Sequence, residues 1–164
     1  MAQNKMTQVE LKFIKLCDLI DKYSNKIEVI KFKYIDLLSH LTQVSILDDT
    51  TFINSVKEIF KMGSIIVCYK ENPLSDEFDI VASGTIIIEP KIIRGGKSVG
   101  HIEDIVTSSK YRGKGLGQDI LELLIQEGRE KNCYKIILDC KDNLKGYYEK
   151  MDFKETGLQM ALYF

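Results

Sequence analysis

The chain has little of several features that would point to particular classes of protein. Its 164 residues include only 2 prolines beside 11 glycines, so it is not a low-complexity sequence. Lysine and arginine total 23 against 24 for aspartate and glutamate, a net charge of −1, which leaves no positive footprint for nucleic-acid binding. No stretch approaches the length of a membrane span, and residues 1–10 hold no apolar run. We therefore expect a cytoplasmic protein with no nucleic-acid or membrane partner.

Cysteine is also sparse, and its spacing does not suggest a metal site. The four cysteines are far apart and form no C-x-x-C pair: Cys17, Cys68, Cys133 and Cys140. The two histidines, His40 and His101, do not complete a zinc site with them. A catalytic cysteine would have no evident histidine partner. We expect reduced thiols and no metal.

What the chain does have is enough apolar sequence for one core. At 18.8 kDa with 45% apolar and 9% aromatic residues, residues 1–164 are predicted to form a single domain. Such a small, neutral domain is expected to act on a small molecule or on another protein.

Apolar spacing predicts a mixed α/β fold. Helices are expected at 7–23, 34–41, 50–62, 116–132 and 143–151, with Asp49 or Thr50 capping the third segment and Gly63 closing it. Strands are expected at 27–32, 65–69, 80–89, 98–106, 135–139 and 159–164. The order is helices, a three-strand meander, then alternating helices and strands.

A glycine-rich turn lies between a predicted strand and a predicted helix. Residues 106–117 read V-T-S-S-K-Y-R-G-K-G-L-G, and the three glycines leave backbone N–H groups uncovered. With the positive end of the following helix and the charges of Arg112 and Lys114, these donors predict a phosphate or pyrophosphate site. Neither the Walker nor the dinucleotide fingerprint fits this spacing.

An acidic pair interrupts the preceding apolar strand, H-I-E-D-I-V at 101–106. In a regular pleat Glu103 and Asp104 would point to opposite faces, one of them toward the interior. Burying a carboxylate is costly unless it is paired. Either both lie at a solvated strand end, or they receive a cationic or hydroxyl-rich ligand.

These motifs resemble those of a known family. R-G-K-G-L-G at 112–117 matches the R/Q-x-x-G-x-G/A pattern with which the GNAT acyltransferase superfamily binds the pyrophosphate of acetyl-CoA. H-I-E-D-I-V, C-Y-K-I-I-L-D-C at 133–140 and Y-Y-E-K at 147–150 resemble the glucosamine 6-phosphate N-acetyltransferase family, over about residues 85–160. L-T-Q-V at 41–44 is a weaker match, in which Ser45 replaces a glycine. The resemblance implies the GNAT fold, a largely antiparallel sheet flanked by helices, with 1–24 as an additional N-terminal helix.

The resemblance also implies a reaction. This family transfers the acetyl group of acetyl-CoA to the 2-amine of D-glucosamine 6-phosphate by direct attack in a ternary complex, a step in UDP-N-acetylglucosamine biosynthesis. The absence of a visible nucleophile–base pair agrees with direct attack. The alternative is a GNAT enzyme that acetylates another small amine or a protein N-terminus. A non-catalytic acyl-CoA-binding module would need neither Asp139 nor Tyr148.

By similarity, roles can be assigned to individual residues. The implied catalytic residues are Tyr148, Asp139 and Glu103. The implied acetyl-CoA contacts are Ile105, Val106, Thr107, Arg112, Gly113, Lys114, Gly115, Leu116, Gly117, Gln118, Asn143 and Tyr148. The implied amino-sugar contacts are Thr42, Lys91, Arg94, Glu103, Asp104 and Asp139. Structural alternatives exist, since Asp139 could cap the helix at 143–151 and Tyr148 could be a core tyrosine.

The phosphate and the oligomer are the points at which this chain departs from the pattern. Relatives carry a basic residue near the C-terminus that reaches a phosphate across a homodimer, whereas this chain has Tyr163, which adds no charge at neutral pH. Lys91 and Arg94 are the expected phosphate ligands, or part of a solvated basic loop. The apolar tail at 158–164 could exchange within a homodimer or complete the sheet of its own chain.

Overall fold

The structure is a computed structural model that describes residues 10–72 and 74–164. Its centre is a five-stranded sheet in the order β1-β2-β3-β4-β5. The strands are β1 (Leu11–Lys15), β2 (Gly63–Glu71), β3 (Phe78–Pro90), β4 (Ser98–Thr107) and β5 (Cys133–Leu138). Neighbouring strands are antiparallel except β4 and β5, which are parallel. The predicted fold class, a mixed and largely antiparallel sheet flanked by helices, is confirmed.

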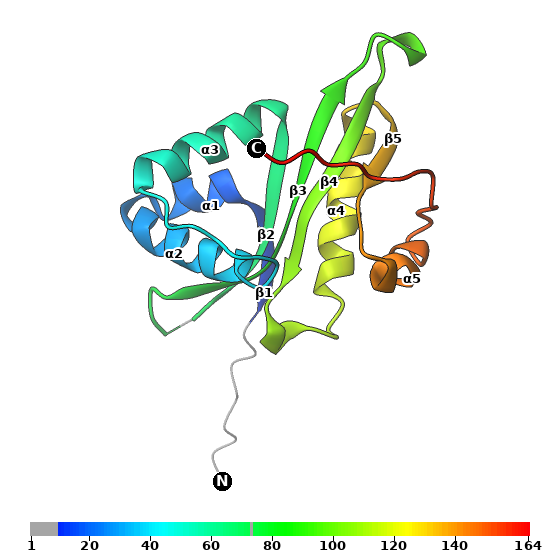
Figure 1. The fold of residues 1–164 in the computed structure, drawn as a ribbon. Helices are drawn as coiled ribbons and strands as arrows, with labels where there is room; N and C mark the ends of the chain where they lie inside the picture. The colour runs from blue at the N-terminus through cyan, green and yellow to red at the C-terminus, as the bar shows by residue number, and fades with distance from the viewer. Residues whose placement is uncertain (1–9, 73) are drawn as a thin grey trace.

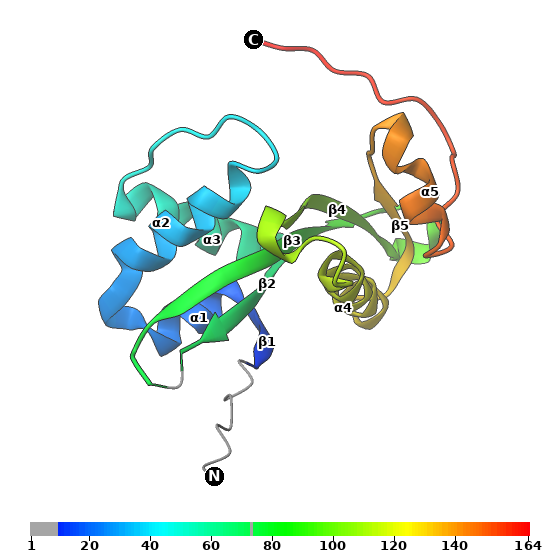
Figure 2. The same cartoon turned by 90° about the horizontal axis from the view of Figure 1, so that it is seen from below.

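Helices cover both faces of the sheet. The helices are α1 (Leu16–Lys22), α2 (Ile27–Leu38), α3 (Asp49–Met62), α4 (Leu116–Glu130) and α5 (Lys145–Glu149). The first three lie together on one face, and α4 crosses the other face (Figures 1 and 2). No helix in the described part of the chain is long and apolar enough to cross a membrane.

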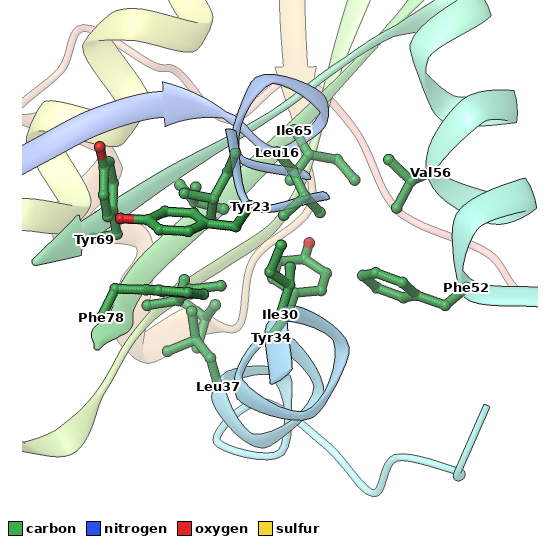
Figure 3. Close-up of a cluster of buried hydrophobic side chains, with 14 residues drawn as sticks. Leu16, Tyr23, Ile30, Tyr34, Leu37, Phe52, Val56, Ile65, Tyr69 and Phe78 are labelled. Atoms are coloured by element: carbon green, nitrogen blue, oxygen red, sulfur yellow. The ribbon is translucent and has the colours of Figure 1, made fainter. Parts of the chain in front are cut away.

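Strand β2 is buried on both faces, which explains its continuous apolar run. Ile65, Val67 and Tyr69 belong to the cluster under α1, α2 and α3, where they meet aromatic side chains from three elements (Figure 3). Ile66 and Cys68 point to the other face and pack in the cluster under α4. The sheet therefore separates two hydrophobic cores and contributes side chains to both of them.

The N-terminal prediction of one helix over 7–23 is wrong. Leu11–Lys15 form β1, which pairs with the edge of β2, and only Leu16–Lys22 are helical; residues 7–9 lie outside the described part. The helical spacing of the apolar residues in this segment was misleading, because those residues belong to two different elements, β1 and α1. Phe13, a member of the supposed apolar face, is 38% exposed on the strand, whereas Leu16 and Leu19 are fully buried.

The strand predicted at 27–32 is also wrong, because Ile27–Leu38 form one helix, α2. Six residues are too few to distinguish alternation from helical spacing. The longer window does so, since Ile30, Tyr34 and Leu37 are spaced three and four residues apart and all are buried.

The remaining helices and strands up to residue 151 are close to prediction. Helix α3 begins one residue earlier than expected, and its N-cap is Asp48, whose carboxylate accepts a 2.8 Å hydrogen bond from the Thr51 N–H. The helix predicted at 143–151 is a short 3-10 turn, Asp142–Leu144, followed by α5.

The strand predicted at 159–164 is wrong for this chain. The tail has no assigned secondary structure, and the sheet of its own chain ends at β5. Five large apolar side chains on it are almost wholly exposed: Leu158, Met160, Leu162, Tyr163 and Phe164. Figure 2 shows the tail extending away from the sheet. A strand needs a neighbouring ladder, and the tail lies beside none in its own chain.

Candidate active site

The candidate site begins where β4 and β5 part. Their parallel ladder ends at the pair Ile102–Leu138, whereas β4 continues to Thr107. The Ser108 N–H donates to the Val81 carbonyl on β3, at 2.9 Å. Because backbone groups alternate along a strand, those of Thr107 and Ile105 face the opening instead. The fork therefore presents an unpaired strand edge on β4.

A β-bulge in β4 lies at the mouth of this fork. On β3 the register advances from Ser83 to Thr85 while on β4 it advances from Val106 to Glu103, so β4 carries one extra residue. Asp104 there has a φ of 54°, in the left-handed region that a non-glycine residue rarely adopts. The prediction that a regular pleat turns one carboxylate inward is wrong, because Glu103 and Asp104 are both exposed.

Room for the bulge comes from Gly84. A Cβ at Gly84 would lie 2.5 Å from Ile105 Cδ1 and 2.7 Å from Ile120 Cγ2. The side chain of Ile105 thus fills the space between the bulge and α4. This packing fixes the extra residue against the α4 face.

Three carboxylates gather at the fork: Glu103, Asp104 and Asp139, the first residue after β5. Partial burial raises the pKa of Glu103, and the negative charges of Asp104 and Asp139 raise it further. Asp139 accepts a 2.9 Å hydrogen bond from Gln159 Nε2. The alternative role of Asp139 as a helix cap is wrong, since the N-cap of the following turn is Lys141.

The glycine-rich turn has the backbone geometry of an anion site. Gly113 and Gly115 have φ values of 76° and 85°, and the space that a Cβ would fill at each is open. Gly115 is the N-cap of α4 and provides no side-chain cap, so the first turn of the helix depends on other acceptors. Gln118 was expected to contact acetyl-CoA, but its backbone N–H is not free to do so, because it already donates to the Gly115 carbonyl. Leu116 is buried, so its backbone alone can face a ligand.

Cations adjoin this turn, and one of them was missed from the sequence. Lys114 Nζ lies 4.7 Å from the centre of the Tyr111 ring, and Lys70 Nζ lies 5.6 Å from the same ring. Lys70 comes from β2, more than forty residues earlier in the chain. Only tertiary structure brings it here. Arg112 follows the short turn Ser109–Tyr111.

Tyr147 is a second residue that the sequence reasoning missed. A Cβ at Gly117 would lie 2.7 Å from the Tyr147 hydroxyl and 3.6 Å from Thr107 Oγ1. The hydroxyl therefore occupies the space beside Gly117, between α4 and the end of β4. Its position next to Tyr148 in the Y-Y-E-K motif was the available signal.

Tyr148 lies deep in the α4-side core. It is 9% exposed and packs edge-on against Tyr147, with ring centres 5.0 Å apart, and against Phe153. Burial raises the pKa of Tyr148 to about 12. The phenol is therefore a protonated donor at neutral pH. Asn143 is exposed in the turn that precedes α5.

Lys91 and Arg94 are not brought together with the acidic residues. Both lie in the β3–β4 turn, beyond the pair Pro90–Ser98, which is five residues from Glu103 along β4, or about 17 Å. Lys91 pairs with Glu89, and the Arg94 guanidinium lies 5.7 Å from the centre of the Tyr134 ring. Thr42 is exposed in the loop between α2 and α3.

An apolar hollow of about 610 Å³ lies elsewhere, over the outer surface of α2, and none of the predicted site residues lines it. In residues 10–72 and 74–164, no group of three or more histidine, cysteine, aspartate or glutamate side chains is arranged to hold a metal ion.

Comparison with known proteins agrees with this geometry. The Acetyltransferase (GNAT) family model matches residues 41–153. A probable glucosamine 6-phosphate N-acetyltransferase 2 of Oryza sativa subsp. japonica is 38% identical over 132 residues, 80% of each chain. The Arabidopsis thaliana glucosamine 6-phosphate N-acetyltransferase is 37% identical over 132 residues, 80% of this chain and 87% of that protein.

Similarity extends to the solved fold. The crystal structure of glucosamine-6-phosphate N-acetyltransferase from Arabidopsis thaliana matches with a TM-score of 0.76 and 32% identity, over 94% of this chain and 99% of that one. The chain belongs to the GNAT acetyltransferase family and, within it, to the glucosamine 6-phosphate N-acetyltransferases.

Proposed function

We propose that this chain transfers the acetyl group of acetyl-CoA to the 2-amine of D-glucosamine 6-phosphate, by direct attack in a ternary complex. The observation that carries the proposal is the fork beyond Ile102 and Leu138, with three carboxylates at its mouth and the glycine-rich turn beyond the end of β4. The relatives named for this reaction support the choice of substrate.

Backbone groups of this chain supply the acetyl-CoA site. The open glycines of the turn and the uncapped start of α4 suit a pyrophosphate. The free edge of β4 at Ile105 and Thr107 suits an extended amide-bearing arm, because it offers unpaired backbone donors and acceptors. The backbone groups of Val106, between them, alternate toward β3, so Val106 would contact the arm without such a bond. Bound acetyl-CoA supplies the thioester from which the acetyl group is transferred. The Ile105 N–H faces the fork and would polarise the thioester carbonyl.

Side chains at the fork would handle the amine and its proton. Asp139 would orient the 2-amine and accept the proton released after attack, while Glu103 and Asp104 hold the sugar. Tyr148 keeps its proton, since burial raises its pKa to about 12. Its hydroxyl would donate that proton or a hydrogen bond to the departing thiolate. Direct transfer needs no nucleophile from the protein.

Phosphate recognition is proposed to involve a second copy of the chain. Lys91 pairs with Glu89 and lies beyond the pair Pro90–Ser98, which is about 17 Å from Glu103 along the strand. The exposed apolar tail has no partner strand in its own chain. We therefore propose a homodimer in which the tail docks on the partner, and in which Lys91 and Arg94 contact the phosphate.

The wider assignments remain part of the same proposal: a cytoplasmic enzyme of one domain, acting in UDP-N-acetylglucosamine biosynthesis without a metal. The test is CoA release measured side by side with glucosamine 6-phosphate, glucosamine, a polyamine and a peptide. We expect turnover with the phosphosugar and little with the others. Turnover of the polyamine or the peptide alone would instead favour a GNAT enzyme for another amine.

A further inference from the structure

Helix α2 sends one buried hydroxyl toward the sheet. Tyr34 is 6% exposed, and its ring packs in the cluster under α1, α2 and α3, 6.2 Å from the ring of Phe52 (Figure 3). Ser83 Oγ, on β3, donates to the Tyr34 hydroxyl oxygen at 3.5 Å. A buried phenol in an otherwise apolar cluster needs such partners.

The partner of this hydroxyl, Ser83, lies on β3 where the register shifts at the acidic bulge. Ser83 and Thr85 are 1% and 4% exposed and flank Gly84, the residue over which Ile105 packs. In the register Thr85 lies opposite Glu103, and Ser83 lies opposite Val106. The bulge is thus supported from two sides: Ile105 and Gly84 on the α4 face, and these hydroxyls on the α2 face.

Burial and charge both act on the Tyr34 hydroxyl. Burial and, to a smaller extent, the negative charge of Asp104 together raise the pKa of Tyr34 to about 12, although hydrogen bonds with Ser83 and Thr85 favour the charged oxygen. Tyr34 therefore stays protonated. The charged groups around the bulge are Glu103, Asp104, Asp139 and His101.

We propose that Tyr34 is a positioning residue for the acidic site: its hydroxyl, bonded to Ser83 beside Gly84, supports the segment of β3 that lies opposite the bulge and so orients the Glu103–Asp104 pair toward the amino sugar. The proposal rests on the proposed function. It ties α2, an element that supplies no predicted catalytic residue, to substrate affinity.

The test compares Tyr34→Phe with a matched control, Tyr23→Phe. Tyr23 belongs to the same cluster, is 9% exposed and donates from its hydroxyl to Glu71 at 2.5 Å. Glu71 is six residues along β2 from Ile65, the register partner of Thr85, so it is remote from the bulge. Both variants keep the aromatic ring and lose one buried hydroxyl.

In Tyr34→Phe we expect KM for glucosamine 6-phosphate to rise roughly tenfold, as for a lost hydrogen bond near a charged group, with KM for acetyl-CoA unchanged. The acidic limb of kcat/KM should shift as well, because the raised pKa of Glu103 depends on how close Asp104 and Asp139 lie to it. Tyr23→Phe should lower the melting temperature without changing either KM or the pH profile.

Two results would overturn the inference. If wild type turns over the phosphosugar and Tyr34→Phe matches Tyr23→Phe in KM and pH profile, Tyr34 is only structural and the proposed function stands. If wild type fails to turn over the phosphosugar, the proposed function falls and the inference falls with it.

Discussion

Ile102 and Leu138 are the last pair of the parallel ladder between β4 and β5, and the strands separate beyond them. The separation of the two strands provides both the free backbone edge and the carboxylates of the site. It frees the β4 edge at Ile105 and Thr107 for backbone pairing, and it places Glu103 and Asp139 on the two sides of the opening. A ladder continued by two more residues would close the fork.

Glu103→Gln is expected to stabilise the protein at neutral pH and to impair turnover. Neighbouring carboxylates and partial burial raise the pKa of Glu103 above its ordinary value of 4.5, so the charged form opposes folding. Because the side chain is exposed, solvent screens this cost and the gain should be at most about 1 kcal/mol. Urea unfolding at pH 7 measures the gain, and CoA release measures the loss.

The pH dependence gives this prediction its sign. The unfavourable charge exists above the folded-state pKa and disappears once the pH falls below the unfolded value. The stabilisation by glutamine should therefore vanish by about pH 4. Glu122→Gln, at an exposed position on α4, should show no such trend. Equal stability of wild type and Glu103→Gln at pH 7 would contradict the clustering of the carboxylates.

Tyr148→Phe is expected to lower kcat by about 10- to 100-fold, the usual range for a lost proton donor. The dissociation constant for acetyl-CoA should change little, because the ring keeps its packing against Tyr147 and Phe153. With its pKa at about 12, Tyr148 does not titrate between pH 6 and 9, so the variant should keep the shape of the wild-type profile. An unchanged kcat would remove Tyr148 from the reaction.

Much of the fold was readable because sequence period and burial agree. The meander of β2, β3 and β4 and the helix α4 follow directly from apolar runs and from the spacing of Leu116, Ile120 and Leu124. The N-terminal half was harder. The edge strand β1 exists only because β2 offers it a ladder, and no local pattern in Leu11–Lys15 encodes that pairing.

The site was predictable where it depends on a local string and not where it depends on tertiary contacts. The glycine turn and the acidic pair follow from R-G-K-G-L-G and H-I-E-D-I-V. The bulge at Asp104 could not be predicted from either string, because it requires the empty space beside Gly84 on a neighbouring strand. Lys70 and Tyr34 were missed for the same reason, because Lys70 reaches Tyr111, and Tyr34 reaches Ser83, from a distant element.

Gly115→Val is expected to abolish acetyl-CoA binding while the protein still folds. At a φ of 85° a β-branched side chain is strained, and relief of that strain moves the backbone donors of the turn. Gly146→Ala is the matched control, since a Cβ there also meets open space and its backbone is not left-handed. Isothermal titration with acetyl-CoA distinguishes them. Retained affinity in Gly115→Val would contradict the role of the turn.

Leu162→Glu is expected to turn a dimer into a monomer. The wild-type mass by light scattering should be twice 18.8 kDa, because five exposed apolar side chains on the tail gain burial only against another surface. A charge at Leu162 should reduce the mass to 18.8 kDa and weaken phosphosugar turnover. Leu74→Glu, at a side chain in the β2–β3 turn that is even more exposed than Leu162, should change neither quantity. A wild-type mass of 18.8 kDa at micromolar concentration would rule out a stable dimer and leave the exposed tail without a partner.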